Sequence, residues 1–225
     1  MVVDVQIIYF NGEFFLMKLQ ISYDFTNLSQ ALEIAKKTAL FADILEVGTP
    51  LLIAEGIRAI ESFKNTFPDK PIIADTKIVD RVSDVIPMLA KAGASAVTIL
   101  YGTSNSVIQK AASIAHKHDM KVILDLIDAE TMGQAARDAE SLDVDSILFH
   151  YPHETSEFYS NIDQWEIVRG NTDLPIFVSG RITKKQILGI KALKPQGMVI
   201  GEAITKADDP AAEAHYFKEK LTPRT

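Results

Sequence analysis

Residues 75–80 read DTKIVD and place two carboxylates, Asp75 and Asp80, around Lys77, directly after the apolar run 71–73. Side chains two apart on a strand share a face, so we expect Asp75 and Lys77 to point the same way. Charge at the end of a buried strand is costly unless it is paired or bound to a ligand. Two carboxylates around one lysine could hold a divalent cation, keep the lysine protonated and aim it at a developing negative charge. A structural ion-pair cluster is the alternative at this stage.

The composition limits the classes of partner. The chain has 225 residues, 47% hydrophobic and 24% charged, which suits one large domain or two small ones. Its net charge of -7 without a basic run argues against nucleic acid or an anionic membrane surface as a partner. The absence of cysteine excludes disulfides, thiolate metal sites and a cysteine nucleophile, and it indicates the cytoplasm. No apolar run is long enough to cross a bilayer.

From residue 18 onward, short apolar strands alternate with amphipathic helices. We expect strands at about 19–24, 43–47, 71–76, 96–100, 121–126, 145–149, 174–178 and 197–200. We expect helices at about 28–40, 51–65, 81–92, 104–118, 129–142, before Gly170, and at 183–193 and 209–221. Such alternation implies parallel strands with right-handed crossovers. Eight even units predict a single (β/α)8 TIM barrel over 17–225.

Residues 1–16 allow two interpretations. Alternating apolar residues on both sides of Asn11 and Gly12 are typical of a β-hairpin. Alternatively, Met17 is the true start and the preceding extension is an error of gene annotation. We favour the second hypothesis, which mass spectrometry of the protein made from its native gene would test.

Polar residues gather where the strands of the predicted barrel end. In such barrels the active site lies at the carboxyl ends of the strands. These positions hold Asp24, Glu46, Asp75, Lys77, Asp125 and His150, with Asp80 just beyond. Several carboxylates at one rim suit a hard cation such as Mg²⁺, which prefers oxygen ligands and keeps several waters. Gly180 and Gly201 follow the last two strands, where these barrels often bind phosphate through backbone N–H groups.

Some of these residues also have purely structural explanations. Asp24 could cap the first helix or occupy a turn before it. His150 taken alone would be a hydrogen-bonded structural histidine, but its position at a strand end favours a functional role. Glu46 lies inside an apolar strand, where a glutamate has few structural explanations.

The stretch 75–80 resembles the Asp-x-Lys-x-x-Asp motif of the orotidine monophosphate decarboxylase suprafamily. The stretch 42–50, ADILEVGTP, is similar to the branch that holds 3-hexulose-6-phosphate synthases and 3-keto-L-gulonate-6-phosphate decarboxylases. The resemblance covers about residues 17–221. It implies a Mg²⁺-dependent enzyme that acts on a phosphorylated ketose through a cis-enediolate, with a homodimer as the catalytic unit.

The resemblance also implies a role for each rim residue. Glu46 and Asp75 would ligate Mg²⁺, and Lys77 would stabilise the enediolate. Asp80 would reach into the active site of the partner subunit. Asp24 would position the site, and His150 would take part in proton transfer.

Within this branch, two positions favour the synthase. The fifth strand reads Leu124-Asp125-Leu126-Ile127, as in the synthases, whereas decarboxylases tend to carry glutamate at the position of Asp125. The decarboxylases carry an arginine after the last strand's glycine, where this chain has Glu202. Synthases join formaldehyde to ribulose 5-phosphate.

The phosphate end departs from the synthase pattern. Synthases usually have two glycines after the seventh strand, where this chain has Gly180 and Arg181. Arg181 could bind phosphate or pair with Glu202. The stretch 151–155 lacks the residues expected after His150. We therefore expect synthase-type chemistry, with β-keto acid decarboxylation or a non-catalytic sugar-phosphate-binding barrel as alternatives.

Overall fold

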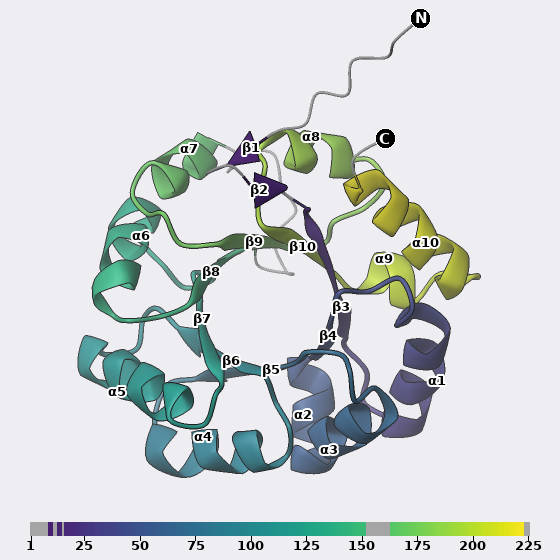
Figure 1. Cartoon of the computed structure of the whole chain (residues 1–225), viewed down its shortest axis with the longest axis horizontal. Helices are drawn as coiled ribbons and strands as arrows, with labels where there is room; N and C mark the ends of the chain where they lie inside the picture. Colours follow the sequence, from purple (N-terminus) through teal and green to yellow (C-terminus); the bar gives the residue numbers. More distant parts are fainter. Residues whose placement is uncertain (1–8, 11–12, 15, 152–162, 223–225) are drawn as a thin grey trace, which may run out of the picture.

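The computed structural model describes residues 9–10, 13–14, 16–151 and 163–222, which form a ring of strands surrounded by helices (Figure 1). The strands are β1 (Tyr9–Phe10), β2 (Glu13–Phe14), β3 (Lys18–Tyr23), β4 (Ile44–Val47), β5 (Ile72–Ile78), β6 (Ala96–Leu100), β7 (Lys121–Asp125), β8 (Ser146–His150), β9 (Ile176–Ser179) and β10 (Gly197–Ile200). The helices are α1 (Leu28–Thr38), α2 (Thr49–Glu55), α3 (Ile57–Thr66), α4 (Val82–Lys91), α5 (Asn105–His116), α6 (Met132–Ser141), α7 (Asp163–Arg169), α8 (Ile187–Ala192), α9 (Glu202–Thr205) and α10 (Pro210–Leu221).

Strands β3 to β10 close into one barrel in the order β10-β3-β4-β5-β6-β7-β8-β9. Every neighbouring pair in the barrel is parallel. The predicted (β/α)8 TIM barrel is therefore confirmed. Because all these strands run the same way, their carboxyl ends meet at one rim.

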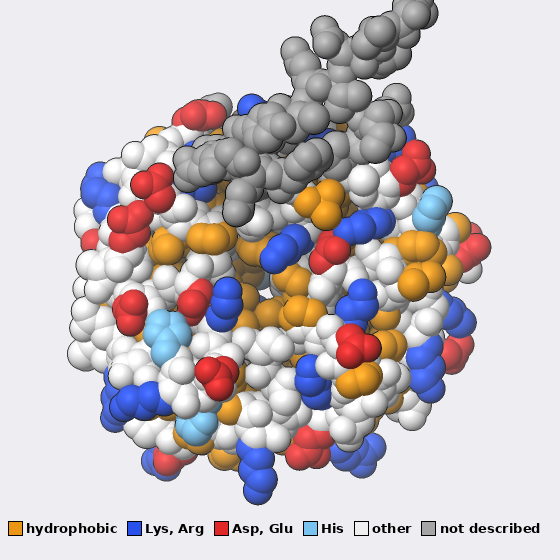
Figure 2. All heavy atoms as spheres, in the orientation of Figure 1, with side chains coloured by type: hydrophobic (Ala, Val, Ile, Leu, Met, Phe, Trp, Pro, Cys, Tyr) orange, Lys and Arg blue, Asp and Glu red, His pale blue; other side chains and the backbone are white. Residues whose placement is uncertain are grey.

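Two separate apolar cores hold the barrel. Alternate side chains of a strand point to opposite faces, so seven of the eight barrel strands serve both cores. The inner core is a layer of side chains from seven of the strands: Ile44, Ile73, Ala96, Ile123, Leu148, Phe177 and Val199. The outer core packs the other strand faces, such as Leu19 and Ile21 of β3, against the helices. Figure 2 shows hydrophobic side chains at the centre of the face in view and charged side chains of both signs around them.

The structure differs from the predicted elements at several points. The helix predicted over 51–65 is divided into α2 and α3, because Gly56 between them has a φ of 61° that ends a right-handed helix. Strand β5 continues beyond Thr76, and its register against β6 shifts between Ala74 and Ile78. The short helix α9 follows β10 directly and has no counterpart among the predicted elements.

The described part of the N-terminal segment is a pair of short strands. Strands β1 and β2 are antiparallel, as a hairpin requires, and the turn residues Asn11 and Gly12 lie outside the described residues. The hypothesis that Met17 is the native start stays a prediction. Across the described part of the chain, no helix combines the length and the apolar character needed to cross a bilayer.

Candidate active site

A polar layer lies directly above the inner apolar core. Two positions after a core residue, the same face of most of these strands carries a polar side chain. Glu46 follows Ile44, Asp75 follows Ile73, Thr98 follows Ala96, Asp125 follows Ile123, and His150 follows Leu148. Because side chains two positions apart on a strand share a face, the layer above the apolar core is a ring of ionisable and hydroxyl groups at the carboxyl rim.

This layer opens into a pocket of about 730 Å³. The predicted site residues that line it are Asp24, Glu46, Asp75, Lys77, His150, Gly180, Arg181 and Gly201. Asp125 does not line the pocket but lies fully buried behind it. Asp80 is exposed and lies outside the pocket of its own chain. The structure therefore brings together all the predicted residues except Asp80, with Asp125 just below the surface of the site.

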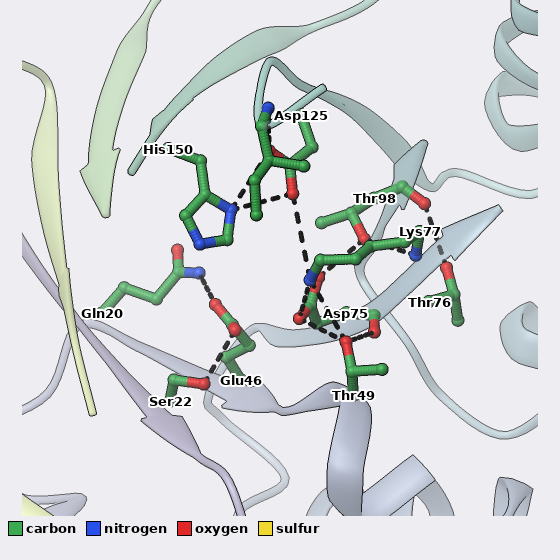
Figure 3. A network of polar contacts seen from close by, with 11 residues as sticks. Gln20, Ser22, Glu46, Thr49, Asp75, Thr76, Lys77, Thr98, Asp125 and His150 are labelled. Atoms are coloured by element: carbon green, nitrogen blue, oxygen red, sulfur yellow. Dashed lines mark hydrogen bonds and ion pairs between the residues drawn. The ribbon is translucent and has the colours of Figure 1, made fainter. Parts of the chain in front are cut away.

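Lys77 lies at the centre of the network in Figure 3. Its Nζ is 2.5 Å from Asp75 Oδ2, 3.1 Å from Thr49 Oγ1 and 3.9 Å from Asp125 Oδ2. The lysine has a left-handed backbone with a φ of 47°, which few non-glycine residues adopt. This conformation falls within the register shift of β5 against β6, at the residue whose ammonium group faces the pocket.

The network keeps both groups of the Lys77–Asp75 pair charged. Burial alone would lower the pKa of the Lys77 ammonium, but Asp75 and, more weakly, Asp125 raise it above its usual range. Burial alone would raise the pKa of Asp75, but Lys77, Thr49 and Thr98 hold it below its usual range. The site thus presents a permanent positive charge at its floor.

His150 is oriented by a buried carboxylate. Its Nδ1 lies 3.0 Å from Asp125 Oδ2 and 3.1 Å from Asp125 Oδ1. The backbone N–H of Ile127 donates a further hydrogen bond to Asp125 Oδ1 at 3.0 Å. A hydrogen bond from Nδ1–H to the Asp125 side chain leaves Nε2 available for proton transfer. Asp125 also links His150 to Lys77.

Glu46 is a buried carboxyl with an unusual pKa. Ser22 Oγ donates a hydrogen bond to its Oε1 at 2.8 Å, and Gln20 Nε2 donates to its Oε2. Burial raises the pKa of Glu46 to about 8, and the negative charges of Asp75 and Asp24 add to the effect. The environment of Glu46 therefore favours its neutral form, and a positive charge placed beside it would lower its pKa.

Glu46→Gln is expected to stabilise the metal-free protein, and more at high pH. A carboxyl whose folded-state pKa is raised to about 8 binds a proton in the folded state that the unfolded state releases above its ordinary pKa near 4.5. The wild type therefore loses stability as the pH rises through this window, whereas glutamine keeps the shape of the side chain without the charge. We expect a gain in the free energy of unfolding on the order of 2 kcal/mol at pH 8 and much less at pH 5.

Urea unfolding at both pH values, with a chelator present, measures this difference. Glu61→Gln is the control, because Glu61 is exposed. A gain that is the same at pH 5 and pH 8 would contradict a raised pKa at Glu46.

The side chain of Asp24 lies close to two glycines, which leave room for it. A Cβ atom on Gly48 would lie 2.1 Å from Asp24 Oδ1, and one on Gly201 would lie 3.1 Å from Asp24 Oδ2. Although the side chain opens to solvent, desolvation by the pocket walls raises its pKa. The cap of α1 is Asn27, so the structural explanation of Asp24 as a helix cap is wrong.

The phosphate end of the pocket carries charges of both signs. Gly180 has a φ of 126°, which disfavours any other residue there, and Arg181 beside it is exposed and lines the pocket. Within the described residues, Glu202 forms an ion pair with Lys206 one helical turn later, not the pair with Arg181 that the sequence allowed. Among the described residues, Arg181, Lys206 and Glu202 thus place charges of both signs at this end of the pocket.

Sequence reasoning missed the neutral members of the network. Thr49, Thr98, Ser22 and Gln20 all bond the carboxylates of the site. Thr98 and Ser22 could have been found by the strand period, since each is two residues from another inward-facing position. In a sequence, hydroxyl and amide side chains are a weaker indication of a functional site than charged side chains are.

The chain is similar to known proteins in sequence and in fold. Residues 17–217 match the family described as Orotidine 5'-phosphate decarboxylase / HUMPS. A 3-hexulose-6-phosphate synthase from Staphylococcus haemolyticus is 30% identical over 207 residues, which cover 91% of this chain and 99% of the relative. The crystal structure of a 3-hexulose-6-phosphate synthase from Salmonella typhimurium has a TM-score of 0.85 at 31% identity and covers 91% of this chain and 98% of its own.

A more distant likeness concerns the fold alone. The structure of a 3-keto-L-gulonate-6-phosphate decarboxylase from Vibrio cholerae O1 biovar El Tor has a TM-score of 0.79 at 23% identity. It covers 91% of this chain and 97% of its own.

Proposed function

The chain belongs to the orotidine 5'-phosphate decarboxylase / HUMPS family, and on this premise we propose that it is a lyase of the 3-hexulose-6-phosphate synthase type. It would join formaldehyde to D-ribulose 5-phosphate through a cis-enediolate. The observation that carries this proposal is the Lys77 ammonium at the floor of the pocket, paired with Asp75 and close to the buried Asp125 that orients His150. A fixed cation beside an oriented base suits removal of a proton next to a carbonyl group.

We propose that Mg²⁺ is the cofactor and that Glu46 and Asp75 hold it. The donor set fits Mg²⁺, because the carboxyl groups of the site outnumber its lysine, Lys77: they are those of Asp24, Glu46, Asp75 and Asp125. The pKa of Glu46 is raised to about 8, and a bound cation would favour its ionised form. The described residues include no group of three or more His, Cys, Asp or Glu side chains arranged as metal ligands. Mg²⁺ is commonly held by one or two carboxylates plus substrate and water, which would complete such a site. Bound there, the ion would supply Lewis-acid neutralisation of charge on the substrate oxygens.

The side chains divide the remaining work. His150 Nε2 takes the proton from C1 of the ketose, because Asp125 holds Nδ1. Lys77 stabilises the negative charge that this step leaves on the enediolate oxygens. A carbon–carbon bond then forms between C1 and the carbon of formaldehyde, and the resulting alkoxide takes up a proton. Asp24, which lies close to Gly48 and Gly201, positions the oxygen atoms of the ketose that come to lie beside it.

The phosphate group would bind at the opposite end of the pocket. Arg181 supplies positive charge, and the backbone at Gly180 and Gly201 supplies N–H donors. The Lys206–Glu202 pair lies beside this subsite, so Lys206 limits the repulsion between Glu202 and a phosphate.

A direct assay compares the two reactions of this branch. Wild-type protein with Mg²⁺ is given formaldehyde and ribulose 5-phosphate, and loss of formaldehyde is followed. A parallel sample is given 3-keto-L-gulonate 6-phosphate, and release of CO₂ is followed. Formaldehyde consumption supports the synthase. CO₂ release alone would replace it with the decarboxylase, and neither reaction would favour a non-catalytic sugar-phosphate-binding barrel.

We also propose a cytoplasmic homodimer in which Asp80 completes the active site of the partner subunit. Asp80 is exposed and lies outside the pocket of its own chain, so a role in catalysis requires a second copy. Asp80→Ala is expected to lower kcat by about 10²-fold while fold and Mg²⁺ affinity are kept. Kinetics, circular dichroism and calorimetric titration with Mg²⁺ measure the three quantities.

A mixing experiment provides the control for shared sites. Inactive Asp80→Ala subunits are mixed with inactive subunits that carry Lys77→Met. Heterodimers would regain one complete site, so activity should return toward a quarter of the wild-type value at equal mixing. Mixtures that remain inactive after subunit exchange would contradict a shared active site.

A further inference from the structure

Two threonine hydroxyls enclose the Lys77–Asp75 pair. Thr49 Oγ1 lies 2.7 Å from Asp75 Oδ2 and 2.8 Å from the Asp75 carbonyl oxygen, and it accepts a hydrogen bond from Lys77 Nζ at 3.1 Å. It thus donates its own proton to Asp75 and accepts one from the lysine. Thr49 begins helix α2 and also lines the pocket.

Thr98 acts on the same pair from the opposite side. Its Oγ1 donates to Asp75 Oδ1 at 2.9 Å and accepts a hydrogen bond from the backbone N–H of Lys77 at 2.9 Å. Thr98 is buried, with 1% of its surface exposed. The hydroxyl therefore satisfies the backbone donor of the residue that has the left-handed φ of 47°.

These contacts leave the pair little freedom. Each carboxylate oxygen of Asp75 accepts a bond from one of the two threonines, and the Lys77 ammonium is tied to both Asp75 and Thr49. Figure 3 shows Thr49 and Thr98 on opposite sides of Asp75. A long lysine side chain has many rotamers in solution, and the bonds of Nζ to Asp75 and Thr49 limit that freedom.

We propose that Thr49 and Thr98 are positioning residues that fix the Lys77 ammonium group where the enediolate charge develops. Thr49 holds the side-chain nitrogen, and Thr98 holds the backbone from which the side chain extends. The proposal rests on the proposed function for its catalytic meaning. The restriction of Lys77 itself follows from the contacts alone.

Such a role has a defined kinetic consequence. A misplaced ammonium group affects the transition state more than the bound ketose, whose charge lies mainly on its phosphate at the other end of the pocket. Thr49→Val keeps the shape and removes the hydroxyl. We expect kcat to fall by roughly 10²-fold and KM to change less than about threefold. Thr49→Ser restores the hydroxyl and should recover most of kcat.

A second readout does not depend on turnover. In protein labelled with ¹³C-lysine, the two ε-methylene protons of Lys77 should give separate NMR signals while Nζ is held, and Lys77→Met identifies them. Thr49→Val is expected to merge these signals. Thr103→Val is the matched control, because Thr103 is also buried but its hydroxyl bonds the carbonyl oxygen of Ile78.

The kinetic and NMR measurements distinguish failure of this proposal from failure of the proposed function. The proposal is supported if Thr49→Val lowers kcat, Thr49→Ser recovers it, and only Thr49→Val merges the lysine signals. It is overturned if the signals of Lys77 stay separate in Thr49→Val, or if Thr103→Val lowers kcat equally. A wild type that lacks turnover would refute the proposed function, and the NMR comparison would still decide whether Thr49 holds Lys77.

Discussion

Lys77→Met is expected to lower kcat by about 10³-fold or more while Mg²⁺ binding is kept. Methionine has a similar length but no charge, so the charge of the enediolate would lose its cationic neighbour at the floor of the pocket. The same change leaves Asp75 and Asp125 without their lysine. The site becomes more negative, and its affinity for Mg²⁺ should stay equal or rise.

Steady-state kinetics and calorimetric titration with Mg²⁺ measure the two effects. Lys218→Met is a closely matched control. Lys218 forms an ion pair with Asp43, and its side chain is 25% exposed, compared with 24% for Lys77. The Lys218 pair lies outside the pocket, so its loss should affect stability but not kcat. Equal losses of kcat in both variants would show that Lys77 acts through stability alone.

Asp75→Asn is expected to remove turnover and Mg²⁺ binding together. The change takes away a proposed metal ligand and the main partner of Lys77, whose Nζ lies 2.5 Å from Asp75 Oδ2. An amide is a weaker ligand for Mg²⁺ and leaves the nearby lysine charge only partly compensated. We expect kcat/KM to fall by about 10³-fold or more.

Steady-state kinetics and calorimetric titration with Mg²⁺ also test this prediction, and thermal unfolding adds a third measurement. Asp43→Asn is the control for an ion pair lost outside the pocket. Mg²⁺ should raise the melting temperature of the wild type and of Lys77→Met but not of Asp75→Asn. Asp75→Asn protein that still binds Mg²⁺ with wild-type affinity would remove Asp75 from the proposed metal site.

The barrel and most of its rim could be predicted because each depends on short-range patterns. The strands alternate regularly with helices, and a charged residue inside an apolar strand, such as Glu46, has few structural explanations. Once the strands are parallel, their carboxyl ends must meet, so Asp75, Asp125 and His150 converge without any knowledge of register.

Features that depend on tertiary contacts could not be predicted in the same way. The left-handed backbone of Lys77 arises with the register shift between β5 and β6, which no local pattern reveals. The partner of Glu202 depends on the start of α9, since only that helix brings Lys206 one turn away. The roles of Thr49 and Thr98 depend on which oxygen atoms they reach across strands.

Two predictions concern parts of the protein beyond the described residues of one chain. The stretch 152–155, which departs from the synthase pattern, lies outside the described residues. Asp80 is exposed in one chain, and its role depends on a second copy.

The most direct test of the enediolate chemistry uses deuterium exchange. Wild-type protein is incubated in D₂O with Mg²⁺ and ribulose 5-phosphate but no formaldehyde, and the C1 proton signal of the sugar is followed by NMR. Ribulose C1 carries two protons, and the proposed roles of Lys77 and His150 predict that the wild type exchanges one of them, whereas both signals persist with Lys77→Met. Two C1 proton signals that both persist in wild-type protein shown to bind Mg²⁺ would contradict enediolate formation from this ketose phosphate.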